Sequence, residues 1–110
     1  MSSPDYRIER DTLGEVKVPA GAYWGAQTQR AVENFPVSGL RAHPALIKAL
    51  VWVKGACASA NRDLGKLEER LACFIDLACT EVDEGAYLDQ WVVDVFQAGA
   101  GTSFNMNTNE

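Results

Sequence analysis

The chain has 110 residues, of which 47% are hydrophobic and 23% are charged, and its formal net charge is −5 at pH 7. This balance is typical of one soluble globular domain with a small core, and it excludes a disordered or fibrous protein. Residues 1–70 hold all ten basic side chains, whereas residues 71–110 hold seven acidic side chains and no basic one. Nucleic acid is therefore not expected as a partner, because phosphate binding needs clustered Lys and Arg.

The sequence gives little indication of a membrane span, a secretory signal or a metal site. The longest apolar run, residues 49–53, is far shorter than the roughly 20 residues of a membrane span. Residues 1–5 lack a basic start and an apolar stretch, so we expect no secretory signal and a cytoplasmic location. The three cysteines lack C-x-x-C spacing, and we expect reduced thiols on helix faces, with no metal or cofactor: Cys57, Cys73 and Cys79.

Short elements are predicted at the beginning of the chain. Apolar and polar residues alternate on either side of residues 11–14 (Asp-Thr-Leu-Gly), which predicts a β-hairpin over residues 6–18. A short helix over residues 22–34 should end before Pro36, because the residue preceding a proline avoids helical geometry. Residues 35–41 then form a connector.

Two long helices are predicted next. The first opens at His43 and Pro44, with proline at the first helical position and His43 as a surface or capping residue. It stops at Gly65. Apolar residues spaced by four and three positions define the face that we expect to be buried: Leu46, Leu50, Val53, Cys57, Ala60 and Leu64.

The second long helix runs from about Leu67 to Gly85 and should pair with the first as a helical hairpin. Its apolar face holds Leu71, Phe74, Ala78 and Val82, with Ile75 and Cys79 beside them. This stripe is interpreted as core or as a surface that packs against another subunit. Residues 89–96 fit either a strand or a buried connector, because periodicity cannot distinguish the two in so short a run.

The tail of the chain carries the residues with the clearest chemical potential. Residues 96–109 have no charge but hold seven polar side chains. Gly99 and Gly101 permit close backbone approaches, and Thr102 or Ser103 is expected to cap a following helix. A glycine loop that leads into a helix start directs backbone N–H groups and a positive dipole end at one point, which suits an anion. An ordinary helix cap would produce the same pattern.

The amides in this tail argue for burial or binding. Asn105, Asn107 and Asn109 are poor helix formers and leave the helix without charge. We therefore expect these side chains to be buried against partners, which are either a substrate or neighbouring helices.

Three blocks of the sequence, residues 6–19, 23–36 and 93–110, resemble the aspartase/class II fumarase superfamily in order and spacing. The resemblance implies a mainly α fold: an N-terminal β-hairpin-like segment, a helical hairpin and a Gly-rich loop that leads into a helix. Members of the superfamily are several times longer, and this sequence stops inside a helix-compatible run. Residues 1–110 are therefore expected to be a single N-terminal domain from a longer helical-bundle lyase.

The resemblance also implies a reaction, the elimination of ammonia or water next to a carboxylate to give fumarate. It places Thr102 where the family has a threonine that contacts substrate, with neighbouring substrate-binding candidates Ala100, Gly101, Ser103 and Asn105. The implied partner is a small dicarboxylate, and the implied assembly is a homotetramer whose sites combine several subunits. No organic cofactor is implied. The family's His segment and the loop with its Ser base are not in this chain, so we expect no catalytic residue here and no activity from the chain alone.

The loop sequence separates the two main branches of the family. Class II fumarases usually read Thr-Gly-Ser-Gly-Thr, whereas residues 98–102 read Ala-Gly-Ala-Gly-Thr, followed by Ser103. Ala100 lacks the hydroxyl of the fumarase serine, and Ala-Gly-Thr-Ser resembles aspartate ammonia-lyases. We therefore expect reversible deamination of L-aspartate by the full-length protein, with class II fumarate hydratase as the alternative.

Overall fold

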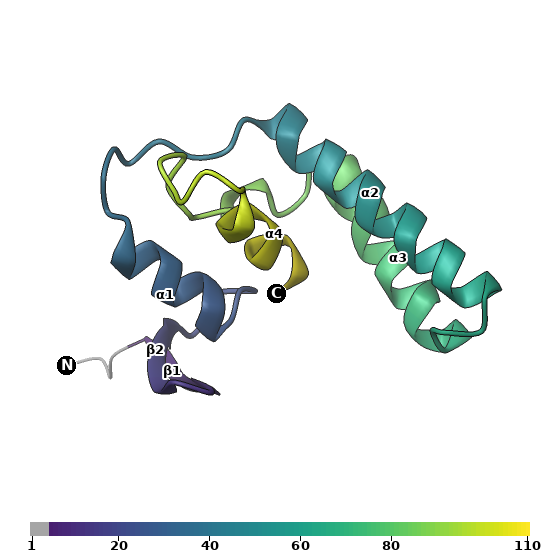
Figure 1. The fold of residues 1–110 in the computed structure, drawn as a ribbon, viewed down its shortest axis with the longest axis horizontal. Helices are drawn as coiled ribbons and strands as arrows, with labels where there is room; N and C mark the ends of the chain where they lie inside the picture. The colour runs from purple at the N-terminus through teal and green to yellow at the C-terminus, as the bar shows by residue number, and fades with distance from the viewer. Residues whose placement is uncertain (1–4) are drawn as a thin grey trace. The chain divides into compact units, whose positions relative to one another are not determined.

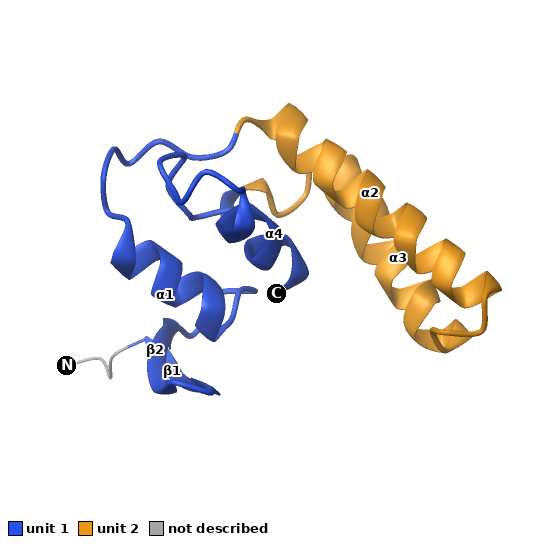
Figure 2. Cartoon of the chain, viewed as in Figure 1, with its two compact units in different colours: residues 1–42, 89–110 blue, residues 43–88 orange. Residues whose placement is uncertain are grey.

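The computed structural model describes residues 5–110. Residues 1–4 lie outside the described residues. The expectation of no secretory signal depends largely on these residues. The chain forms two compact units, one of residues 1–42 with 89–110 and the other of residues 43–88 (Figure 2). Within residues 5–110, no helix combines the length and the apolar character that crossing a membrane requires.

The first unit begins with the predicted hairpin. Strands β1 (Tyr6–Asp11) and β2 (Gly14–Pro19) pair antiparallel, with Asp11 opposite Gly14 at the turn. Gly14 has a φ of 116°, a conformation that other residues adopt only with strain. The alternating pattern of β2 turns Val18 inward, where it is fully buried in the small core of this unit.

Helix α1 (Ala26–Asn34) begins four residues later than predicted. The guanidinium of Arg7 binds the carbonyl oxygens of Ala22 (2.8 Å) and Trp24 (2.6 Å), which holds this stretch outside the helix. The C-terminal end is as predicted, two residues before Pro36.

The second part of this unit follows a 3₁₀ turn over Leu88–Gln90. Residues 91–101 are an irregular connector, which settles the alternative between strand and connector. The N–H of Val92 donates to the side chain of Asn107 and so does not pair with a strand. Helix α4 (Thr102–Asn109) packs against α1 (Figure 1).

The second unit is the predicted helical hairpin of α2 (Pro44–Asp63) and α3 (Glu69–Asp83). His43 is the capping residue of α2, and its Nδ1 accepts a hydrogen bond from the N–H of Ala45 at 3.0 Å. A glycine with positive φ follows each helix as expected, with φ of 72° at Gly65 and 100° at Gly85. Helix α3 begins two residues after its predicted start.

The predicted buried face of α2 is wrong in most of its members. The buried residues of this helix are Ile47, Val51 and Ala58, whereas Val53 is 59% exposed. Gly55 approaches the side chain of Cys79 closely, since a Cβ at Gly55 would lie 3.7 Å from its Sγ.

The predicted face of α3 is corrected in the same way. The buried residues of α3 are Ala72 and Val82, whereas Phe74 is 56% exposed. Only Val82 belonged to the predicted face. Two helices bury only a narrow strip of each other's surface, and here that strip is offset from the face that the spacing predicted, so most of the predicted apolar side chains remain outside it. That these side chains pack against another subunit stays a prediction.

Candidate functional site

The glycine loop before α4 makes two tight turns. The N–H of Gly99 donates to the carbonyl of Gln97 at 2.8 Å, and the N–H of Ala100 donates to the carbonyl of Ala98 at 2.7 Å. Gly99 and Gly101 have φ of 72° and 76°, in the left-handed region. Both glycines are therefore required by the path of the backbone, and the amides of residues 99 and 100 are already used within the loop.

The expected hydroxyl cap of α4 is wrong. Gly101 is the N-cap residue and no side chain at that position caps the helix, so Thr102 is already the first helical residue. The amide oxygen of Gln97 instead accepts a hydrogen bond from the N–H of Phe104 at 3.3 Å. Gln97 thereby performs the role predicted for Thr102 or Ser103, which follow the N-cap position.

Three consecutive backbone amides remain open at this helix start. Within residues 5–110, the N–H groups of Gly101, Thr102 and Ser103 have no acceptor. They lie at the positive end of the helix dipole, and residues 96–109 contribute no charge of either sign. This arrangement can hold a carboxylate through neutral donors.

The side chains around these amides divide between two faces of α4. Thr102 and Asn105 are three residues apart, so they share one face, and both are exposed. Ser103 is 7% exposed and belongs to the packed side of the helix. Ala100 is exposed in the loop. The structure thus presents Ala100, Gly101, Thr102 and Asn105 to solvent, whereas Ser103 contributes its backbone amide alone.

The asparagines of α4 differ in environment. Asn107 is 5% exposed. Its Nδ2 donates to the carbonyl of Gln90, and its Oδ1 accepts from the N–H of Val92, each at 3.0 Å. The expected burial against partners is therefore confirmed for Asn107, whereas Asn105 and Asn109 are exposed. Both partners of Asn107 are backbone groups of residues 90–92, so its side chain attaches this segment to α4.

A buried carboxylate anchors the chain just before the loop. Asp94 is 8% exposed and accepts hydrogen bonds from the N–H of Ser38 (2.7 Å), the hydroxyl of Ser38 (2.8 Å), the N–H of Gly39 (2.8 Å) and the N–H of Phe96 (2.9 Å). The bond from Phe96, with those from Ser38 and Gly39, holds the pKa of Asp94 far below its usual range. Asp94 is therefore a structural anion rather than a proton acceptor.

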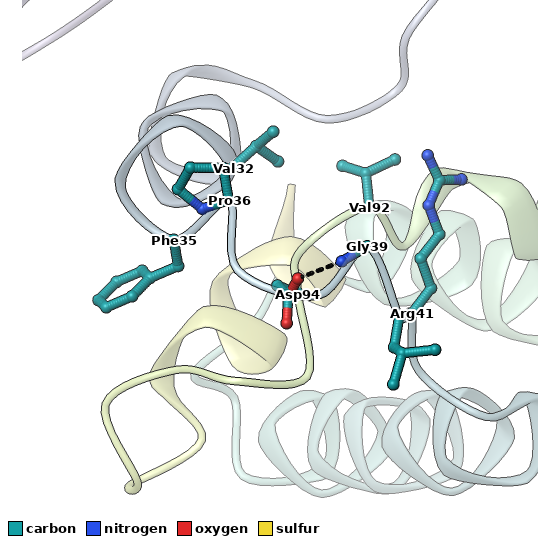
Figure 3. Close-up of a pocket in the computed structure, with 8 residues that line it drawn as sticks. Val32, Phe35, Pro36, Gly39, Arg41, Val92 and Asp94 are labelled. Carbon is teal, nitrogen blue, oxygen red and sulfur yellow. Dashed lines mark hydrogen bonds between the residues drawn. The ribbon is translucent and has the colours of Figure 1, made fainter.

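Asp94 also lines a pocket of about 290 Å³ in the same unit (Figure 3). Its wall is mainly apolar and includes Phe35, Pro36 and Val92, with the guanidinium of Arg41 pointing away from Asp94. None of residues 98–105 lines it. The pocket is thus separate from the open amides of α4.

A second carboxylate binds the start of α1. The side chain of Glu110 accepts hydrogen bonds from the backbone N–H groups of Gly25 (3.1 Å), Gln27 (3.1 Å) and Thr28 (2.7 Å). These are amides that no residue of α1 itself caps. Glu110 therefore connects the C-terminal end of α4 to the N-terminal end of α1.

Comparison with known proteins identifies the family of the chain. A family model described as "Lyase" matches residues 14–110. The class II fumarate hydratases of Halobacterium salinarum and Mycobacterium tuberculosis are each 57% identical over 108 residues, which is 98% of this chain and 23% of the relative. An aspartate ammonia-lyase from a Bacillus species is 53% identical over 106 residues, which is 96% of this chain and 23% of that relative.

The chain belongs to the aspartase/class II fumarase superfamily. A crystal structure described as fumarate lyase:delta crystallin from Brucella melitensis superimposes with a TM-score of 0.91 and 51% identity, covering 94% of this chain and 24% of the other. The class II fumarase of Schistosoma mansoni superimposes with a TM-score of 0.92 at 34% identity, covering 96% and 22%. The chain thus spans about a quarter of the length of its relatives.

Three residues that organise this part of the lyase chain were not identified from the sequence: Asp94, Gln97 and Glu110. A signal existed for Asp94, because a lone carboxylate in an otherwise uncharged and partly apolar segment is typical of a buried, paired charge. Gln97 and Glu110 carry no local signal. Gln97 bonds to one backbone carbonyl and one backbone N–H, whereas Glu110 bonds to backbone N–H groups that lie 82 to 85 residues away.

Within the described residues, no group of three or more His, Cys, Asp or Glu side chains is arranged to hold a metal ion. The Nδ1 of His43 is used in capping α2. Cys57, Cys73 and Cys79 are free thiols, and burial raises the pKa of Cys79.

Proposed function

We propose that the complete protein containing this chain is an aspartate ammonia-lyase, with residues 1–110 as its N-terminal domain. The observation that carries the proposal is the row of open amides at Gly101, Thr102 and Ser103, next to the exposed side chain of Thr102. Such neutral, prearranged donors suit a substrate carboxylate at the positive end of a helix.

The reaction makes two separate demands on the protein. A base removes a proton from Cβ, and the electron pair of that C–H bond gathers on the adjacent carboxylate as an aci-carboxylate. The C=C bond of fumarate then forms as the C–N bond breaks and ammonia leaves. This chain supplies donors for the negative charge, and the base comes from segments outside it.

The proposal also specifies the leaving group, which is ammonia rather than water. Aspartate carries an ammonium group, whereas malate carries a neutral hydroxyl, so an additional hydroxyl donor in the loop has no evident use for aspartate. Ala100 supplies no such donor, which supports deamination. Class II fumarate hydratase is the second candidate, because relatives with that name reach 57% identity against 53% for the aspartate ammonia-lyase.

The proposal extends to substrate class and assembly. The substrate is a four-carbon dicarboxylate, since fumarate is common to both candidate reactions, and the complete protein is a homotetramer. The exposed apolar side chains of α2 and α3 support an assembly that covers them, among them Val53 and Phe74.

The test is a comparison of two substrates with the complete protein. Fumarate formation from L-aspartate and from L-malate is followed by absorbance, and kcat/KM is determined for each. We expect a ratio that favours aspartate by orders of magnitude. A ratio that favours malate would replace the proposal with fumarate hydratase.

A further inference from the structure

The side chain of Gln97 connects the two ends of the glycine loop. Its Nε2 donates to the carbonyl oxygen of Asp94 at 3.0 Å, and its Oε1 accepts from the N–H of Phe104 at 3.3 Å. One neutral side chain therefore joins the residue that anchors the connector to the first turn of α4.

The anchor of this link is rigid. The carboxylate of Asp94 accepts four hydrogen bonds, from Ser38, Gly39 and Phe96, so the carbonyl that Gln97 contacts belongs to a well-restrained residue. The glycine loop, by contrast, contains residues with wide conformational freedom. Gly99 and Gly101 both occupy left-handed conformations and have the widest backbone freedom of any residue type.

The link also selects which amides stay open. Gln97 occupies the fourth amide of the helix start, that of Phe104, and leaves those of Gly101, Thr102 and Ser103 available. Because Gln97 is uncharged, it caps the helix without placing a negative charge beside a site for an anion.

We propose that Gln97 is a positioning residue for substrate: it holds the loop so that the three open amides point at one carboxylate. This inference rests on the proposed function. Donors that are held in place before substrate arrives bind and stabilise charge better than donors that must first be ordered, so releasing the loop weakens carboxylate binding.

The first test is Gln97→Met in the complete protein, with whichever of aspartate or malate the wild type uses. Methionine keeps the length of the side chain and removes both hydrogen bonds. We expect kcat/KM to fall about five- to tenfold, as for the loss of one or two net hydrogen bonds, with a rise in KM because the substrate carboxylate is already charged when it binds.

The second variant, Gln97→Glu, retains an acceptor for Phe104 but introduces a charge. Because Glu also lacks the donor to the carbonyl of Asp94, the thermal unfolding midpoint should fall about as much as in Gln97→Met, whereas KM should rise more than in Gln97→Met. Added salt should reduce this excess, since it screens the repulsion between Glu and the substrate carboxylate. A purely structural role would not make KM depend on salt in this way.

The matched control is Gln90→Glu, the same chemical change at a glutamine that also accepts a backbone hydrogen bond, from Tyr23 at 2.9 Å. Its KM should stay within twofold of the wild type. Variants at Gln97 that unfold earlier but keep the wild-type KM at low and high salt would overturn the positioning role alone. A folded wild-type protein that forms fumarate from neither substrate would overturn the proposed function and this inference together.

Discussion

Two adjacent hydroxyl side chains begin α4 and face opposite environments. Thr102 is exposed, whereas Ser103 is buried on the packed side of the helix. Successive residues of a helix point about 100° apart, so two neighbours can face different environments. Of the two, only the hydroxyl of Thr102 is placed to meet a ligand at the open amides.

We predict that Thr102→Val in the complete protein lowers kcat/KM for its substrate by roughly one to two orders of magnitude. Valine keeps the shape of the side chain and removes the hydroxyl, and a hydrogen bond to a charged group contributes about 1.5–3 kcal/mol. Steady-state kinetics measure the effect. Thr102→Ser, which retains the hydroxyl, should recover most of the activity, and unchanged kinetics in Thr102→Val would reduce Thr102 to a structural role.

Helix α1 depends on another element for its N-terminal cap. No side chain at Gly25 caps it, and its first turn contains no acidic residue. Glu110 supplies the missing acceptor from the far end of α4. Burial raises the pKa of Glu110, but hydrogen bonds from Thr28, Gln27 and Gly25 outweigh this, so the pKa lies below its ordinary value. The charged form of Glu110 therefore stabilises the contact between α1 and α4.

We predict that Glu110→Gln lowers the free energy of unfolding at pH 7 by about 1 kcal/mol, as for loss of a helix cap. Because the folded state lowers the pKa of Glu110, its contribution is complete above the ordinary glutamate value of about 4.3 and is lost as the pH falls through the folded value. The difference between wild type and variant should thus be largest near neutrality and shrink below about pH 4.

Thermal unfolding across this pH range measures the difference. Glu33→Gln is the matched control, because Glu33 lies in the last turn of α1 and accepts one long hydrogen bond, from Gln29 at 3.4 Å. Its stability should change little. A Glu110→Gln variant with the same stability as wild type at every pH would show that the cap does not contribute.

Within residues 5–110, many large apolar side chains are exposed. Seven large apolar residues form a set that is large for so small a core: Trp52, Val53, Leu71, Phe74, Ile75, Trp91 and Val92. In the structure Trp91 is buried and Val92 is half-buried, whereas the other five, all in the unit of α2 and α3, are exposed. The helical hairpin therefore carries the five exposed members of this set.

We predict that the 110-residue chain self-associates or binds a hydrophobic dye, because contiguous exposed apolar side chains favour association. Light scattering and dye fluorescence measure this. The double variant Leu71→Gln, Phe74→Gln should reduce both signals, whereas Leu13→Gln, at a single exposed leucine in the β-hairpin, should not. A monodisperse monomer without dye response would contradict the prediction.

Much of this chain follows from local sequence signals. Pro44 and Gly65 delimit α2, the alternation around Gly14 defines the hairpin, and Gly101 leads into α4, as the structure confirms. Each of these depends on the conformational limits of one residue or on contacts between residues close in sequence, so the pattern alone determines it. The resemblance of three sequence blocks determined the superfamily in the same direct way.

Only the tertiary structure decided which groups meet across the chain. The buried residues of α2 are Ile47, Val51 and Ala58, which lie beside the face that the spacing predicted and are of similar size to its members. The start of α4 is capped by Gln97 instead of a hydroxyl, and that of α1 by Glu110. Backbone amides at a helix start accept any oxygen that the fold brings within reach, and sequence spacing does not record which oxygen that is.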